Sequence, residues 1–397
     1  MSDLDHPLII KFGGTSVGGG AQFTRAAKIA ADAAAARPVA VVVSAMSGVT
    51  NTLLGAARGN VEADATAELR RALEERHLEA AREAVAAEYL PGVEERLLAL
   101  LDRLVAAIQA PAVQPAARKA EIAVYGERLS STILAGAISS QDAPARVVAE
   151  DPIATGAEFS ASEVDAEETE RRCARLVAPL LDGGLVAVVP GYVGRSPEGL
   201  PTTLGRGGSD LSATVLGRAV GSSEVWIMTD VDGVLDADPR LVPDATLMPR
   251  LSYEEAGVFA GLGAKVLHPK TMEPASESGM EVFVRNSFAP KRPGTRVTGF
   301  EAGPGVRCVA LRREVAVEIP CADGRESKAA MVVCIGSPDD EDLARGLKIL
   351  RSAGIPAWHH GIASAGLVYV VAVEAGEAAL RALHGSLITT PVVEEVA

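Results

Sequence analysis

A segment near the N-terminus reads Leu8-Ile9-Ile10-Lys11-Phe12-Gly13-Gly14-Thr15-Ser16-Val17. Its apolar beginning predicts a short buried strand. Gly13 and Gly14 let backbone N–H groups approach an anion without a Cβ in the way, and Lys11 adds a fixed positive charge. A glycine pair after a strand is often only a turn, so the phosphate site predicted here needs support from other parts of the chain.

Apolar runs alternate with helical patterns along the first half of the chain. A helix predicted at residues 21–36 lies between strands predicted at 8–10 and 39–43. Further buried strands are predicted at residues 145–148, 185–189 and 224–228. This order predicts an α/β fold with a mainly parallel central sheet, whose ligands bind where the strands end.

Composition divides the chain into two predicted domains. Residues 61–110 are rich in Ala, Glu, Leu and Arg, which predicts exposed amphipathic helices inserted into the first domain. A break in composition at residues 301–305 predicts the boundary between a first domain, 1–303, and a second domain, 304–397. A length of 397 residues fits about two or three domains.

The second domain has the pattern of a small α+β fold. Strands are predicted at residues 331–335, 357–362, 367–373 and 391–393, and helices at 339–353 and 376–384. This β-α-β-β-α-β order is typical of a ferredoxin-like domain. So small a sheet cannot cover both of its faces, and we therefore expect a homodimer or higher homo-oligomer formed through this domain.

The bulk composition excludes several classes of function. Apolar residues make up 48% and aromatic residues 4%, so the core must consist mainly of Ala, Val and Leu. A net charge of −14 argues against general binding of nucleic acid or of an anionic membrane. An anionic substrate would therefore need a local basic pocket.

The cysteines and the N-terminus indicate a cytoplasmic protein without a resident metal. Cys173, Cys308, Cys321 and Cys334 are widely spaced and predict free thiols rather than a zinc site. The first residues are acidic and do not resemble a signal peptide. No run approaches the roughly 20 apolar residues that a membrane helix needs.

Other glycine-rich and charged segments lie at the ends of predicted elements: residues 47–51, 126–130, 205–210, 229–233 and 263–269. With Lys11 they supply the cations Arg206, Arg240 and Lys265 and the carboxylates Glu127, Asp210 and Asp230. Phosphoryl transfer needs such a set, because lysine, backbone N–H groups and Mg²⁺ neutralise the transferring group. Singly, Glu127 also fits a solvated helix start and Asp230 a turn; the combination favours a site.

The segments K-F-G-G-T-S-V, V-V-S-A-M-S-G-V-T-N, G-E-R-L-S, G-R-G-G-S-D, T-D-V-D-G-V and G-A-K-V-L-H-P resemble, in this order, those of aspartate kinase in the amino acid kinase superfamily. The resemblance covers residues 8–300. It implies the amino acid kinase fold, a three-layer α/β/α sandwich, and a kinase that uses ATP with Mg²⁺.

The resemblance also implies roles for individual residues. Lys11 would contact the phosphates and stabilise the transition state, and Asp210 would organise the catalytic centre. The implied substrate-binding residues are Ser44, Thr50, Glu127, Arg206, Gly207 and Ser209. Among them Arg206 would hold a carboxylate of the substrate and Glu127 its α-ammonium group.

The implied ATP-binding residues are Lys11, Gly13, Gly14, Thr15, Ser16, Thr229, Asp230, Leu235, Arg240 and Lys265. Leu235 departs from the family, which commonly has tyrosine at this position. It keeps an apolar contact and loses the ring and hydroxyl, so nucleotide affinity or base preference is expected to differ.

The implied reaction is ATP-dependent phosphorylation of the β-carboxylate of L-aspartate to 4-phospho-L-aspartate, a step toward lysine, threonine and methionine. Two alternatives stay open. One is a related kinase that acts on another carboxylate-bearing amino acid in a specialised pathway. The other is a non-catalytic, amino-acid-binding regulatory subunit.

The second domain resembles an ACT domain, the module with which aspartate kinases bind end-product amino acids. Family members typically carry two such modules, whereas the chain after Gly305 has room for one and an extra strand at residues 315–319. Residues 336–340 lack a clear glycine-rich effector loop. The domain is therefore expected to be reduced, and inhibition by lysine or threonine stays open.

Overall fold

The computed structural model describes residues 6–58, 62–110, 114–262, 269–301, 303–320, 326–363 and 366–388. The chain divides into two compact units. The first unit extends to Asp232 and includes Lys270–Pro293, and the second contains Gly233–Pro269 and the chain from Gly294 onward. These units are defined by packing, and the domain boundary expected near residue 303 stays a prediction.

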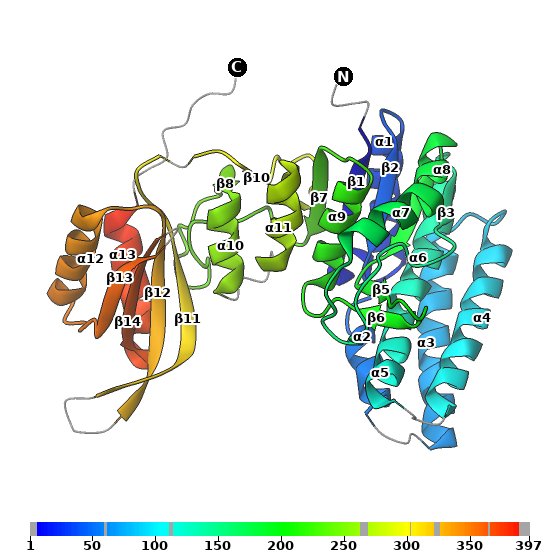
Figure 1. Cartoon of the computed structure of the whole chain (residues 1–397), viewed down its shortest axis with the longest axis horizontal. Helices are drawn as coiled ribbons and strands as arrows, with labels where there is room; N and C mark the ends of the chain where they lie inside the picture. The colour runs from blue at the N-terminus through cyan, green and yellow to red at the C-terminus, as the bar shows by residue number, and fades with distance from the viewer. Residues whose placement is uncertain are drawn as a thin grey trace. The chain divides into compact units, whose positions relative to one another are not determined.

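A parallel sheet forms the centre of the first unit (Figure 1). Its strands are β1 (Leu8–Phe12), β2 (Val39–Val43), β3 (Ala145–Val147), β4 (Val186–Pro190), β7 (Glu224–Thr229) and β9 (Glu281–Asn286). The spatial order is β3-β4-β2-β1-β7-β9, and every neighbouring pair is parallel. The predicted α/β fold with a mainly parallel sheet is confirmed.

Helices cover both faces of this sheet, as a parallel sheet requires. On one face, Leu8, Ile10 and Phe12 share an apolar core with helices α1 (Gly20–Ala34) and α6 (Tyr125–Ser139). On the other face lies α9 (Gly208–Ala219), where Gly217 approaches the side chain of Val225. The result is a three-layer sandwich.

The predicted helical insertion contains helices α3 (Ala63–Ala84) and α4 (Leu90–Gln109). Each helix is amphipathic and buries an apolar stripe in the main core. In α4 this stripe includes Leu97, Leu101 and Leu104, none of which is exposed. The two helices therefore extend the layer formed by α1 and α6.

Shorter elements complete the first unit. They are η2 (Gly14–Val17), α2 (Val49–Ala56), α5 (Pro115–Ala123), α7 (Ala166–Leu176), α8 (Ala178–Asp182), β5 (Val193–Arg195), β6 (Pro201–Thr203) and α11 (Pro269–Ser278). The N-terminus of α7 is capped by the Asp165 side chain, which accepts a hydrogen bond from the Glu168 N–H at 3.0 Å. Within the described residues no helix is both long and apolar enough to cross a membrane.

The second unit contains an antiparallel sheet with the order β11-β12-β14-β13. The strands are β11 (Gly305–Pro320), β12 (Glu326–Ser337), β13 (His359–Ala363) and β14 (Gly366–Ala372). Helices α12 (Asp340–Ser352) and α13 (Gly376–Leu387), with η3 (Val373–Ala375) before α13, pack on one face around the fully buried Tyr369. This arrangement fits the ferredoxin-like fold predicted for the C-terminal part.

A shorter parallel pair also belongs to the second unit. Strands β8 (Arg250–Ser252) and β10 (Thr295–Thr298) lie side by side, and helix α10 (Tyr253–Gly261) follows β8 directly. A capping box between Ser252 and Glu255 begins this helix. Arg307 donates two hydrogen bonds to the Glu255 carboxylate at 2.9 and 2.8 Å, so β11 is tied to α10.

The C-terminal prediction was incomplete at its first strand. The expected extra strand at residues 315–319 is the distal part of the long strand β11, so the described order is β-β-α-β-β-α. Register shifts in the pairing of β11 with β12 flank Val315, and charged residues precede it in the sequence. The alternation of apolar and polar residues that predicts a strand is therefore interrupted at this point. The strand predicted at 391–393 lies outside the described residues.

We expect Gly366→Ala to destabilise the second unit by about 1–3 kcal/mol. A Cβ at Gly366 would lie 2.4 Å from the Cys334 carbonyl oxygen, so two paired strands would have to separate. Gly385→Ala on α13 is the matched control, because a Cβ there meets no described residue within 4 Å. Thermal unfolding should show a lower stability than wild type for Gly366→Ala and no decrease for Gly385→Ala. Equal stability of the two variants would contradict the close approach of the strands at Gly366.

Candidate active site

Polar residues from several loops meet in a pocket of about 360 Å³ in the first unit. The loops follow β1 and β2 or precede α2, α6 and α9. The sequence-predicted residues that line this pocket are Lys11, Gly14, Ser44, Thr50, Glu127, Gly207, Ser209 and Asp210. Residues from distant parts of the sequence are thus brought together where strands end and helices begin, as parallel-sheet proteins place their ligands.

An ion pair joins two sides of the pocket. The Lys11 Nζ lies 2.5 Å from Asp210 Oδ1, and only 11% and 13% of the two side chains are exposed. Lys11 comes from the central strand β1, and Asp210 from the first turn of α9. Removing either partner would leave a charge that water reaches poorly, which is costly. The pair therefore holds the lysine at a fixed place beside the pocket.

The loop after β1 approaches the chain after β2 closely at Gly14. A Cβ at this position would lie 2.9 Å from the Ala45 carbonyl oxygen, so a larger residue would displace one of the two loops. The Gly13 N–H donates to the Met228 carbonyl at 3.2 Å. Gly14 is thus the glycine of this loop that lines the pocket, whereas the N–H of Gly13 is used within the fold.

Ser16 faces the protein interior. Its hydroxyl group lies 2.8 Å from the Ser287 hydroxyl and 3.3 Å from the Met228 carbonyl, and the residue is buried. Thr15 beside it is exposed. The Ser16 side chain therefore ties the loop to β7 and to the end of β9, and its contact with ATP stays a prediction.

Glu127 is the most strongly perturbed carboxyl group of the pocket. Burial raises its pKa from 4.5 to about 8, although hydrogen bonding to the Ala45 backbone and the Thr50 hydroxyl opposes this shift. The residue is 3% exposed, and its Oε2 has no hydrogen-bond partner in the described structure. A buried carboxyl oxygen without a partner beside an open pocket fits an incoming cationic group.

Helix α9 begins at the pocket after a glycine turn. Gly207, its N-terminal cap, has a φ of +69°, which residues with a side chain rarely adopt. The N-terminus of a helix favours an anion, because its first N–H groups lack partners within the helix. Arg206 is exposed and does not line the pocket, although Gly205 and Gly207 on both sides of it do.

Tyr192 lines the pocket but was not found by sequence reasoning. It follows β4 with a φ of +68°, and its N–H donates to the Ser212 hydroxyl at 2.9 Å. Burial and the nearby Glu127 carboxylate raise the pKa of its phenol, while a hydrogen bond with Thr203 opposes them. Its place directly after a parallel strand was the only signal that could have identified it.

The predicted ATP-binding residues outside this pocket lie in different parts of the chain. Thr229 and Asp230 end β7 in the first unit, where the Thr229 hydroxyl donates to Asp230 at 3.2 Å. Leu235 and Arg240 belong to the second unit, and the Arg240 guanidinium donates to both carboxylate oxygens of Asp238. Lys265 lies outside the described residues, so this half of the ATP site stays a prediction.

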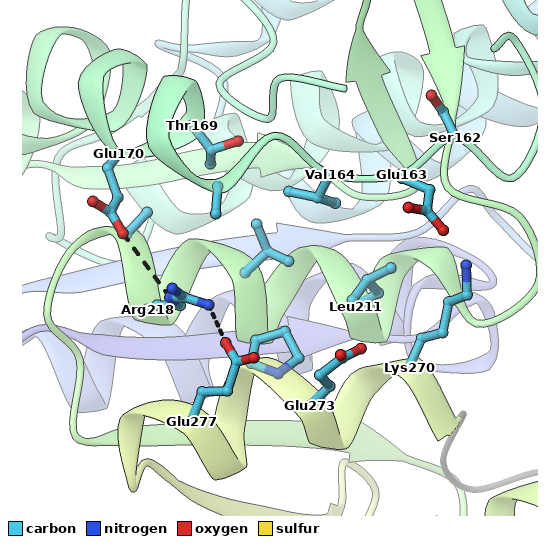
Figure 2. Close-up of a pocket in the computed structure, with 14 residues that line it drawn as sticks. Ser162, Glu163, Val164, Thr169, Glu170, Leu211, Arg218, Lys270, Glu273 and Glu277 are labelled. Atoms are coloured by element: carbon cyan, nitrogen blue, oxygen red, sulfur yellow. Dashed lines mark hydrogen bonds and ion pairs between the residues drawn. The ribbon is translucent and has the colours of Figure 1, made fainter. Parts of the chain in front are cut away.

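A separate pocket of about 300 Å³ lies between α7, α9 and α11 (Figure 2). Arg218 there forms ion pairs with Glu170 and Glu277. None of the sequence-predicted site residues that the structure describes lines it. It is therefore a weaker candidate for the chemistry than the pocket at Lys11.

Comparison with known proteins identifies the family. A model described as the amino acid kinase family matches residues 7–286. The chain is 34% identical over 322 residues to lysine-sensitive aspartokinase 3 of Escherichia coli, covering 79% of this chain and 68% of that protein. The chain belongs to the aspartokinases of the amino acid kinase family. The resemblance seen in the sequence motifs is thereby confirmed.

Other aspartokinases are similar in sequence and fold. Chloroplastic aspartokinase 3 of Arabidopsis thaliana is 34% identical over 305 residues, covering 73% of this chain and 52% of that protein. The structure of E. coli aspartokinase III with lysine and aspartate matches 98% of this chain and 100% of that chain, with 27% identity and a TM-score of 0.83. The same enzyme with aspartate and ADP gives 26% identity and a TM-score of 0.80, covering 97% and 100%.

We predict that Glu127 makes the stability of this aspartokinase decrease as the pH rises. Its pKa is raised in the folded state, so the folded protein binds the proton more tightly than the unfolded chain. The full stabilisation by Glu127 is present below about pH 4.5. It is lost as the pH rises toward 8, and the free energy of unfolding then falls by at most about 1.4 kcal/mol per pH unit.

Urea unfolding between pH 5 and 8 measures this effect. Relative to wild type, Glu127→Gln should become steadily more stable with rising pH, because glutamine does not ionise. Glu198→Gln, at an exposed position between β5 and β6, is the control and should follow wild type at every pH. Parallel curves for wild type and Glu127→Gln would contradict the raised pKa.

Proposed function

We propose that the chain catalyses ATP-dependent phosphorylation of the β-carboxylate of L-aspartate, forming 4-phospho-L-aspartate. One observation carries the proposal: Lys11, Glu127 and Asp210 line a single pocket at the carboxyl end of the parallel sheet. Membership of the aspartokinases supports it, and so does the similarity to an aspartokinase solved with aspartate and ADP.

Each end of the substrate has a matching group. The free Oε2 of Glu127 accepts the α-ammonium group of aspartate, and that ammonium stabilises the ionised form of Glu127. Arg206, exposed at the rim, is free to form a bidentate pair with a substrate carboxylate. The β-carboxylate is already ionised at neutral pH, so its oxygen attacks the γ-phosphorus without a general base.

Lys11 supplies the charge that the transferring group needs. Its ammonium group neutralises negative charge that spreads over the phosphoryl oxygens, and Asp210 keeps it in position. The N-terminus of α9 and the loop at Gly14 also line this pocket. The site is therefore positioned and polarised before the substrates bind.

Magnesium would enter with the nucleotide. Within the described residues no group of three His, Cys, Asp or Glu side chains could form a metal cage. Mg²⁺ commonly binds through substrate phosphates, one or two carboxylates and several waters. We therefore assign it to the ATP phosphates, with Asp210 or Asp230 orienting its waters.

The remaining nucleotide contacts are proposed from the family resemblance. Thr229, Asp230, Arg240 and Lys265 are assigned to ATP, and Leu235 to an apolar contact without a ring or hydroxyl. Arg240 is paired with Asp238, so a phosphate group would compete with that carboxylate for the guanidinium. This competition provides a reason for nucleotide affinity to depend on the local conformation of the loop.

The expected homo-oligomer finds support in the second unit. Trp358 is 42% exposed and Ile362, in the edge strand β13, is 50% exposed. An edge strand with exposed apolar residues is a natural position for a second copy of the chain. The cytoplasmic location predicted from the sequence remains part of this proposal.

Hydroxylamine trapping tests the reaction. Purified protein with ATP, Mg²⁺, L-aspartate and hydroxylamine should form aspartyl hydroxamate, because hydroxylamine attacks the acyl phosphate. L-glutamate, D-aspartate and other carboxylate-bearing amino acids provide an acceptor panel. Product with another acceptor only would favour the related-kinase alternative, and amino-acid binding without any ATP turnover would favour the regulatory subunit.

We expect Lys11 and Arg206 to act on different kinetic constants. Lys11→Ala should lower kcat roughly 10²- to 10³-fold, because the lysine acts mainly on the transition state. Arg206→Ala should raise the KM for aspartate roughly 10- to 100-fold, because a charge-assisted pair is lost. Arg146→Ala, on the exposed side of edge strand β3, is the control. An unchanged kcat would remove Lys11 from the mechanism.

A further inference from the structure

A second charged pocket, of about 470 Å³, lies elsewhere in the first unit. Helices α4 and α6 form part of its wall, and the chain after β3 and β4 forms another part. Among the residues that the structure describes, it shares no lining residue with the pocket that holds Lys11 and Asp210. Any ligand here would therefore bind outside the proposed aspartate site.

Arginine dominates the lining of this pocket, which we call the arginine pocket. Its charged lining residues are Arg96, Arg103, Arg128, Arg195, Glu150 and Asp151. The excess of positive charge is notable in a chain with a net charge of −14. A local basic pocket is what such a chain needs in order to bind a small anion.

The two carboxylates neutralise only part of the charge of these four arginines. Asp151 is buried and is shared between Arg128, at 2.9 Å, and Arg195, at 3.6 Å. Glu150 lies within 3.6 Å of Arg172 and 3.5 Å of Arg175, and neither of these arginines lines the pocket. Most of the negative charge of Glu150 is thus directed to arginines outside the pocket.

Two arginines on α4 remain without a carboxylate. Arg96 and Arg103 stand seven residues apart, which places them on the same face of the helix and about 10 Å apart along its axis. Both are exposed, and neither has an ion-pair partner in the part of the chain that the structure describes. Their guanidinium groups are available at the mouth of the pocket.

Deeper in the pocket, one buried donor lacks an acceptor. The Arg195 Nε is buried and has no hydrogen-bond partner among the described residues. Tyr125, only 5% exposed, lies under the Arg128 guanidinium at 5.7 Å from the ring centroid. A buried donor without an acceptor is uncommon in folded proteins, and a bound anion would satisfy the Arg195 Nε.

We propose that the arginine pocket binds a small organic anion with at least two negative charges, carried by carboxylate or phosphate groups. Guanidinium groups form bidentate hydrogen bonds with either kind of group, so one chemistry serves both. Arg96 and Arg103 bind one end of the anion, and Arg128 and Arg195 bind the other. The assignment does not depend on the reaction at the aspartate site.

Isothermal titration calorimetry of the whole protein, without ATP or aspartate and at low ionic strength, tests this assignment. The probes are citrate for the carboxylate arm, pyrophosphate for the phosphate arm, and acetate as a singly charged control. We expect citrate or pyrophosphate to bind one molecule per chain with a Kd below about 10 mM. Acetate should bind much more weakly.

Variants locate the binding. The double variant with Arg96→Ala and Arg103→Ala should bind the polyanion with roughly 10- to 100-fold lower affinity, because charge-assisted hydrogen bonds are lost. The corresponding double lysine variant keeps the charge and should recover part of the affinity. Arg71→Ala, at an exposed position of α3 away from the pocket, is the matched control and should bind as wild type does.

The result that overturns the proposal is equally specific. Failure of both polyanions to bind, or equal weakening by the α4 double variant and by Arg71→Ala, would show that the arginines form only a solvated surface. Aspartyl hydroxamate formation by the double variant, measured without added polyanion, should match wild type. A failure of the arginine pocket is therefore distinguishable from a failure of the proposed function.

Discussion

The ion pair between Lys11 and Asp210 is the interaction on which the rest of the site depends. Lys11 lies in a strand with buried parallel neighbours on both sides, where a lone ammonium group would be costly. Asp210 reaches it because α9 begins directly after the turn at Gly207. The start of α9 and the loop after β1 are therefore fixed together, and both line the pocket to which we assign the substrates.

The sequence was sufficient for the parallel sheet because its strands are continuous apolar runs. Strand β2 was predicted with its observed bounds, residues 39–43. Strand β11 was predicted only in part, since a bulge and adjacent charges interrupt its alternation. Helices α3 and α4 were predicted as amphipathic, but their composition alone does not identify the elements against which the apolar stripe packs. A sequence pattern is sufficient to predict an element when all of its residues lie in the same environment, as they do in the buried strands.

The site could be predicted as a set of residues but not as a geometry. Motifs identified Lys11, Glu127 and Asp210, and the structure brings all three to one pocket; their roles remain predictions. Tyr192 escaped because a positive φ after a strand has no signature in a non-glycine residue. The raised pKa of Glu127 was likewise invisible, since it arises from burial by chain segments distant in sequence.

The path of the chain through its two compact units limits how this protein can be divided. The chain passes from one unit to the other after Asp232, returns at Lys270, and leaves again after Pro293. Ala237 and Val242 lie in the segment Gly233–Pro269. They share an apolar core with Val306 and Val309 of β11. A break at residue 303 would separate Gly233–Pro269 from the strand with which it shares this core. Neither unit can therefore be inherited, exchanged or shed by proteolysis as one continuous piece.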